Sequence, residues 1–167
     1  MRERLAGWLW PLAVANILAN IGIVVTGAAV RLTASGLGCP TWPRCTEESY
    51  TAHGELGLHG VIEFGNRLLT FVLAAIAVLC FVSALCSRDR TATRLSFLIG
   101  LYIPLQAVIG GITVLTDLNP WVVSLHFIAS MVIIVFCLAL LDHLRSPTRE
   151  PAPRRTQGVA GAVFVVG

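Results

Sequence analysis

Residues 61–85 read VIEFGNRLLTFVLAAIAVLCFVSAL, and this stretch decides the fold class of the chain. It carries no charged residue after Arg67, and it is long enough to cross about 30 Å of hydrocarbon, which takes roughly 20 residues of α-helix. Of all 167 residues, 56% are hydrophobic and only 13% are charged, a low charge content for a soluble domain. The composition therefore predicts a protein that spans a membrane.

Three further apolar runs of similar length flank this stretch, and a soluble core of this size could not bury all of them. We expect spanning helices at about residues 9–30, 61–85, 95–115 and 121–141. The first run is too long for the apolar part of a signal peptide and contains Asn16 and Asn20, so we expect it to be retained. The later connections are short, which predicts an all-α membrane protein built as an antiparallel four-helix transmembrane bundle.

The chain divides into three segments on this scheme. Residues 1–141 form the bundle. Residues 142–157 contain three prolines and four arginines, which is typical of a cytoplasmic linker. Residues 158–167 are apolar but too few to span a bilayer, so we interpret them as the start of a truncated fifth transmembrane helix.

All twelve basic residues are arginines, and their distribution predicts the orientation of the chain. Nine of them fall in alternate connections, which the positive-inside rule assigns to the cytoplasm: Arg2, Arg4, Arg88, Arg90, Arg94, Arg145, Arg149, Arg154 and Arg155. We therefore expect a multi-pass protein of the cell membrane with a cytoplasmic N-terminus and an outer loop at residues 31–60. The net charge of +3 follows from this bias and predicts no nucleic-acid partner.

The outer loop contains two cysteines in the Gly- and Pro-rich segment GLGCPTWPRC, residues 36–45. On the oxidising face of the membrane, Cys39 and Cys45 favour a disulfide that closes a small loop. Two free thiols are one alternative, and a zinc site is another, although His53 alone cannot complete its ligand set. The other cysteines lie in or beside the apolar runs and are interpreted as packing residues: Cys80, Cys86 and Cys137.

His126 interrupts the otherwise apolar fourth run. Ionisable residues inside a membrane are costly, so a functional role is the first interpretation. A neutral imidazole inside a helical bundle is a suitable axial ligand for haem iron. The alternative is a structural histidine that is hydrogen-bonded to a carbonyl or to Ser130. His143 lies roughly 25 Å further along the helix at 1.5 Å per residue and is interpreted as interfacial.

The start of the second run presents three polar groups on one face. His59, Glu63 and Asn66 are spaced four and three residues apart, so a helix brings them into line. Arg67 follows Glu63 by four residues and is an available partner for its carboxylate. A haem propionate is another possible partner for Arg67. The structural alternative is a Glu63–Arg67 pair that takes no part in chemistry.

Two segments together resemble the haem A synthase family: GAAVRLTASGLGCPTWPRC at residues 27–45 and IEFGNRL at residues 62–68. His126 also fits the position of a family histidine in the fourth helix. The resemblance implies an eight-helix enzyme made of two similar four-helix halves. This chain corresponds to the N-terminal half, which holds the substrate haem. The C-terminal half, absent from this sequence, is implied to hold a haem b.

The resemblance also implies a reaction and three residue roles. Successive hydroxylations convert a methyl group of haem O to a formyl group, which gives haem A for cytochrome c oxidase. Carried over by position, Glu63 is implied to be catalytic, Cys39 and Cys45 to form a disulfide, and His126 to bind haem iron. Glu63 would handle a proton or stabilise charge near the reacting carbon.

This chain departs from the family at one position. Much of the family has a histidine three residues after the helix glutamate, whereas this chain has Asn66, which binds haem iron poorly. Either His59 supplies a second axial ligand with the haem shifted outward, or His126 is the only protein ligand. A single ligand leaves an open iron face, which suits oxidation chemistry. We expect Asn66 and Arg67 to lie against the haem.

The expected partners are the haem O substrate, membrane lipid and the C-terminal half, together with haem O synthase and cytochrome oxidase subunits. Two other functions fit the pattern less closely. A non-catalytic b-type cytochrome subunit would use two histidines at matched depth, and His59 with His126 approximates this arrangement. A membrane assembly scaffold would bind no haem at all.

Overall fold

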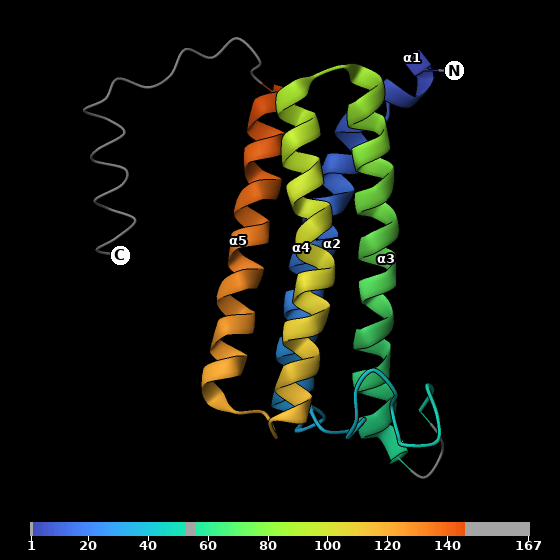
Figure 1. Ribbon diagram of the computed structural model, residues 1–167, viewed down its shortest axis with the longest axis vertical. Coiled ribbons are helices and arrows are strands. Elements are labelled where there is room, and N and C mark those ends of the chain that lie inside the picture. The colour runs from blue at the N-terminus through green and yellow to red at the C-terminus, as the bar shows by residue number, and fades with distance from the viewer. Residues whose placement is uncertain (1, 53–55, 146–167) are drawn as a thin grey trace, which may run out of the picture.

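The computed structural model describes residues 2–52 and 56–145, which form helices joined by loops (Figure 1). A short helix, α1 (Arg2–Ala6), precedes four long ones: α2 (Leu9–Leu32), α3 (Gly57–Ser87), α4 (Arg90–Leu115) and α5 (Pro120–Arg145). No strand occurs in these two stretches. The long helices are long and apolar enough to cross a membrane. The predicted all-helical fold, with four helices that could span a membrane, is confirmed.

The four long helices lie side by side and are connected at alternate ends (Figure 1). Their contacts close a bundle, because α2 and α4 each pack against both α3 and α5. One end carries residues 33–52, and we call it the loop end. The opposite end carries the turn between α3 and α4, and we call it the arginine end because Arg88, Arg90 and Arg94 cluster there.

The helices differ from the predicted ones mainly in where they begin and end. Both α3 and α4 begin earlier than predicted, and the short helix α1 was not predicted at all. Helix α5 continues to Arg145, so residues 142–145 are helical although the sequence placed them in a linker. The rest of that linker and the predicted fifth helix at residues 158–167 lie outside the described residues.

The polar and apolar surfaces of the bundle are arranged as hydrocarbon requires. Asn16 and Asn20 are only 1% and 2% exposed, and the Asn20 amide donates to the side-chain and backbone oxygens of Asn16 at 3.0 and 2.8 Å. Large apolar side chains such as Leu18, Phe71 and Trp121 are instead exposed on the outside. Polar groups inside and apolar groups outside are stable in lipid, where an unpaired amide is costly.

Asp89 connects the helices at the arginine end. Its Oδ1 accepts hydrogen bonds from the Thr91 and Ala92 N–H groups, which caps the start of α4. Its Oδ2 lies 2.8 Å from Nε2 of His143 near the end of α5. Partial burial raises the pKa of Asp89, but the hydrogen bonds from Ala92, His143 and Thr91 outweigh it, and the pKa is lowered.

Candidate functional site

A disulfide between Cys39 and Cys45 closes the loop at the loop end. Both residues are fully buried, and their Cα atoms lie 4.4 Å apart. Of the arrangements that the sequence left open, the structure contains the disulfide. No group of three or more metal-ligating side chains occurs within residues 2–52 and 56–145. His53, the other residue considered for a zinc site, lies outside these ranges.

Glu63 is buried beneath this loop and both of its oxygens are bonded. Its side chain is 7% exposed. Oε2 accepts a hydrogen bond from the Cys39 N–H at 2.7 Å, and Oε1 accepts two from the Arg67 guanidinium at 2.5 and 3.2 Å. The i, i+4 pairing read from the sequence is therefore present. The carboxylate also holds the first cysteine of the loop, which the spacing alone did not predict.

Arg67 donates five hydrogen bonds, which equals the number of its N–H groups. Besides the two to Glu63, it donates to the backbone carbonyls of Cys39, Thr41 and Arg44 at 2.9, 3.0 and 3.1 Å. Because three loop carbonyls accept hydrogen bonds from the same guanidinium, the Arg67 side chain of α3 fixes the shape of the loop. In this arrangement Arg67 has no N–H left for a haem propionate.

Two glycines allow the loop to lie directly on the helices. A Cβ at Gly38 would collide with the backbone carbonyl of His59 at the start of α3. A Cβ at Gly111 would collide with the indole ring of Trp42, so the tip of the loop is packed onto α4 at this point. Neither contact could be read from the sequence, because each depends on which helix the loop crosses.

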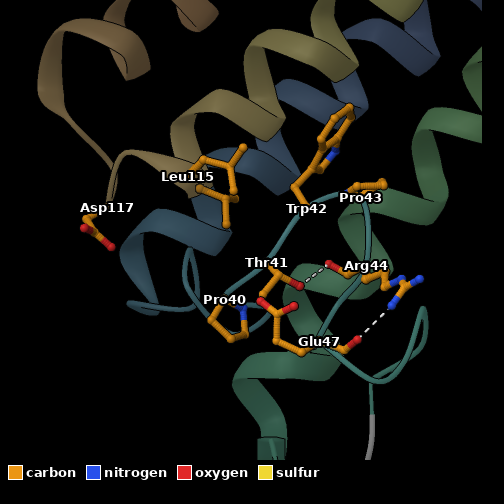
Figure 2. A pocket seen from close by; sticks show the side chains of 9 residues that line it. Pro40, Thr41, Trp42, Pro43, Arg44, Glu47, Leu115 and Asp117 are labelled. Atoms are coloured by element: carbon orange, nitrogen blue, oxygen red, sulfur yellow. Dashed lines mark hydrogen bonds between the residues drawn. The ribbon is translucent and has the colours of Figure 1, made fainter.

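An open pocket of about 410 Å³ lies between the loop and the end of α4 (Figure 2). Figure 2 shows it between loop residues such as Thr41 and Glu47 and the α4 residues near Leu115. Hydrogen bonds from the Thr41 hydroxyl to the Arg44 carbonyl and from the Arg44 guanidinium to the Glu47 carbonyl keep this part of the loop in shape. Neither Glu63 nor His126 lines the pocket, so this hollow is separate from the site that the sequence predicted.

The other two polar residues of the predicted α3 face contact different neighbours. Nδ1 of His59 lies 2.9 Å from the Ser35 hydroxyl, and the residue is exposed. Oδ1 of Asn66 accepts a hydrogen bond from the Thr26 hydroxyl of α2 at 2.7 Å. His59, Glu63 and Asn66 thus share a face, as the spacing predicted, but each is held by a different segment.

His126 lies on α5 where that helix meets α4. Its Nδ1 is buried, and neither ring nitrogen has a hydrogen-bond partner in the described part of the chain. The Ser130 hydroxyl donates to the backbone carbonyl of His126, not to its ring. The structural alternative, a histidine ring held by Ser130, is therefore not what the structure contains. An imidazole without a protein partner inside a spanning helix fits the role of a haem ligand.

Helix α4 shapes the surroundings of this imidazole. A Cβ at Gly110 would lie 3.3 Å from Cε1 of His126, so the ring rests on the bare backbone of α4. One turn earlier, the Gln106 amide donates to the His126 carbonyl at 3.2 Å and to the Ser130 hydroxyl at 2.6 Å. Gln106 therefore holds the segment of α5 that carries His126. Gln106 and Gly110 are four residues apart and so share one face of α4, but this spacing does not show which residue they meet.

Together these features define a class of protein. The chain is a multi-pass helical membrane protein whose bundle is covered at one end by a disulfide-closed loop. It carries a histidine, inside a helix long and apolar enough to span a membrane, whose buried Nδ1 has no hydrogen-bond partner among the described residues.

The chain belongs to the family of cytochrome oxidase assembly proteins, whose family model matches residues 10–56 and 57–167. It is 33% identical over 133 residues to the heme A synthase of Geobacillus thermodenitrificans, which covers 78% of this chain. It is 28% identical over 153 residues to the heme A synthase of Bacillus pumilus, which covers 85% of this chain. No solved structure matches it.

The chain spans about half the length of the curated relatives it matches. The aligned part covers 41% of the Geobacillus protein and 48% of the Bacillus protein. A third relative, the heme A synthase of Alkalihalophilus pseudofirmus, is 27% identical over 163 residues, which are 93% of this chain and 54% of that protein. The similarity thus extends over nearly all of this chain but over only about half of each relative.

Proposed function

We propose that this chain is the N-terminal half of a haem A synthase, a membrane oxidoreductase that oxidises the methyl group of haem O to a formyl group. Its family and its relatives named heme A synthase support this function. Within the fold, the observation that carries the proposal is His126, whose buried Nδ1 has no hydrogen-bond partner in residues 2–52 and 56–145. The product, haem A, would serve cytochrome c oxidase.

In this proposal His126 binds the iron of the substrate haem. Two contacts orient the imidazole ring. The ring packs against Gly110, and the backbone carbonyl of His126 accepts a hydrogen bond from Gln106. Residues that orient a metal ligand through neighbouring contacts change how strongly it binds. The haem itself supplies the redox chemistry, and the bundle positions the porphyrin and excludes water.

Glu63 is proposed as the catalytic carboxylate of this half. Arg67 and the Cys39 N–H both donate hydrogen bonds to its carboxyl oxygens, which fixes the position of the group beneath the loop. An ionised carboxylate can accept a proton or stabilise positive charge that develops during oxidation of the methyl carbon. The same bonds make Glu63 an anchor of the disulfide loop, so its substitution would affect both chemistry and loop structure.

Two ways of holding the haem iron are proposed. In one form His59 binds the iron, which its Nε2 could do because its contact with Ser35 uses Nδ1. In the other form His126 would be the only protein ligand. The Asn66 amide is held by Thr26, and it would contact the porphyrin without binding the iron.

We place this half in the cell membrane as an antiparallel bundle, with its N-terminus in the cytoplasm and the disulfide loop outside. A C-terminal half, which would hold a haem b for electron transfer, is proposed as the partner of this bundle. Haem O synthase and cytochrome oxidase subunits are proposed as partners, because they make the substrate and use the product.

The competing function is a b-type cytochrome subunit that only transfers electrons. The presence of two imidazoles whose Nε2 atoms have no hydrogen-bond partner in the described residues, those of His59 and His126, is the observation that favours it. The buried Glu63–Arg67 pair beneath a disulfide loop has no role in simple electron transfer. Family membership also favours the synthase.

The deciding experiment is a pyridine haemochrome analysis of the full-length protein from cells that make haem O. We expect wild type to accumulate haem A and His126→Ala to lose haem from this half. Glu63→Gln is expected to retain haem O without converting it. If all three proteins carry the same unmodified b-type haem, the protein is an electron carrier and the proposal is wrong.

A further inference from the structure

An open pocket of about 400 Å³ lies at the arginine end of the bundle, far from the loop and from His126. Its lining consists of three arginines and two smaller residues: Leu85, Arg88, Arg90, Thr93 and Arg94. The local fold brings the arginines together. Arg88 ends α3 in a left-handed conformation, and Arg90 and Arg94 are one turn apart on the first two turns of α4.

The side chain of none of these three arginines makes a hydrogen bond or an ion pair with any residue of the described ranges. All three are exposed. The nearest acidic residue, Asp89, uses its carboxylate to cap α4 and to contact His143. Among residues 2–52 and 56–145, no ion pair neutralises the positive charge of the pocket, and its guanidinium N–H groups are available to an anion.

The surface beside the pocket is apolar and faces outward. Leu85 forms part of the lining and is half-exposed. Val82 continues this exposed apolar surface along α3, and Phe97 does so along α4. A ligand that fits here has an anionic group for the guanidinium groups and a hydrocarbon part for the helices. Planar guanidinium groups bind phosphate oxygens in pairs, and basic pockets at the ends of spanning helices suit anionic lipid headgroups.

We propose that this pocket binds the phosphate group of an anionic phospholipid, whose acyl chains lie along the exposed apolar faces of α3 and α4. A free phosphate ion would satisfy the same guanidinium groups, but it would make no use of the apolar surface that adjoins them. The proposal depends on the four spanning helices and is independent of haem binding.

The test is native mass spectrometry of the full chain in detergent, titrated separately with phosphatidylglycerol, phosphatidylcholine and inorganic phosphate. The pocket variant carries three changes: Arg88→Gln, Arg90→Gln and Arg94→Gln. The control variant carries Arg2→Gln, Arg4→Gln and Arg145→Gln. It loses the same charge from the same end of the bundle (Figure 1) and keeps the pocket intact.

We expect the pocket variant to bind phosphatidylglycerol roughly 10- to 100-fold more weakly than wild type, and the control to change by less than about three-fold. The single variant Arg94→Gln should lose roughly five-fold, and circular dichroism should show that each variant remains folded. An equal loss in both triple variants would show that only overall charge matters and would overturn the proposal. Saturation of the pocket by inorganic phosphate in competition with the lipid would overturn it as well.

Discussion

Arginine occurs at both ends of this bundle and is used in opposite ways. At the loop end, Arg67 is partly buried and donates all of its hydrogen bonds within the protein, to Glu63 and to three loop carbonyls. At the arginine end, Arg88, Arg90 and Arg94 are exposed and have no partner among the described residues. A guanidinium that is satisfied internally determines structure, whereas an unsatisfied one is free to bind a ligand.

The largest expected effect comes from removing the arginine that is fully engaged. Arg67→Met removes its hydrogen bonds and leaves Glu63 buried without its ion pair, so the free energy of unfolding should fall by roughly 3–5 kcal/mol. Arg94→Met should change it by less than about 0.5 kcal/mol. Both are measured by reversible unfolding in mixed detergent micelles, followed by circular dichroism.

A conservative variant sharpens this test. Arg67→Lys retains the positive charge but has only three N–H donors and no planar fork, so its stability should lie between wild type and Arg67→Met. Equal losses in Arg67→Met and Arg94→Met would mean that the loop does not depend on the guanidinium, and the contrast between the two ends would fail.

The disulfide is expected to have the next largest effect. Replacement of Cys39 and Cys45 by serine should lower the free energy of unfolding by roughly 2–3 kcal/mol, because a short closed loop is released. Arg67 holds the same loop, so the combined variant should lose less than the sum of the separate losses. Strictly additive losses in this double-mutant cycle would show that the disulfide and Arg67 stabilise different structures.

The arrangement of the helices was predictable from the sequence because it depends on features that are local. The length of the apolar runs located all four spanning helices, and the positions of Asn16 and Asn20 marked the inner face of α2. The helix ends were less accurate, since polar residues such as Arg90 and Thr91 can extend a helix beyond its apolar part. Helix α1 was missed because it consists largely of charged residues, whereas the helices were predicted from apolar runs.

The site was predictable only where its residues are close in sequence. The Glu63–Arg67 pair and the Cys39–Cys45 disulfide follow from spacing along one segment. The contacts of Gln106 with α5 and of Gly111 with the loop depend on how separate segments meet in space. Such contacts require the relative register of two helices or the path of a loop, neither of which has a local signal.

A pair of matched glycine variants tests how the loop is seated. Gly111→Ala should lower the free energy of unfolding by about 1–3 kcal/mol, because its methyl group would displace the ring of Trp42. Gly100 lies on the same helix, and no atom lies within 4 Å of the position that a Cβ would take there. Gly100→Ala should therefore raise the free energy of unfolding by about 0.5–1 kcal/mol, because alanine favours the helix more than glycine does. Similar shifts for both variants would mean that Trp42 does not rest on α4.

A smaller effect is expected where α4 supports His126. Gln106→Leu removes the amide that holds the His126 carbonyl and the Ser130 hydroxyl. Haem binding to this half should weaken by roughly five- to ten-fold, measured by haem titration of the protein followed at the Soret band. Ser124→Ala serves as a control on the same helix, because its hydroxyl bonds only to the Pro120 carbonyl. Unchanged haem affinity in Gln106→Leu would remove Gln106 from the site.

The smallest effect concerns Asp89, which lies between Arg88 and Arg90 in the sequence. Its pKa is lowered from 3.8 in the folded chain, so its ionised form stabilises the fold at any pH above that value, and this stabilisation is lost as the pH falls through the lowered pKa. Asparagine caps a helix about as well as aspartate. In Asp89→Asn, the free energy of unfolding should therefore depend less on pH in the acidic range only. Thermal unfolding measured below about pH 5 tests this.

The same variant examines the contrast between the two ends directly. If the carboxylate of Asp89 serves only the α4 cap and His143, its neutralisation should leave the affinity for phosphatidylglycerol within about two-fold of wild type, because little charge is withdrawn from the pocket. A rise of ten-fold or more would show that Asp89 had neutralised the arginines in wild type. The arginine end would then resemble the loop end, with its guanidinium groups satisfied by the protein and not by lipid.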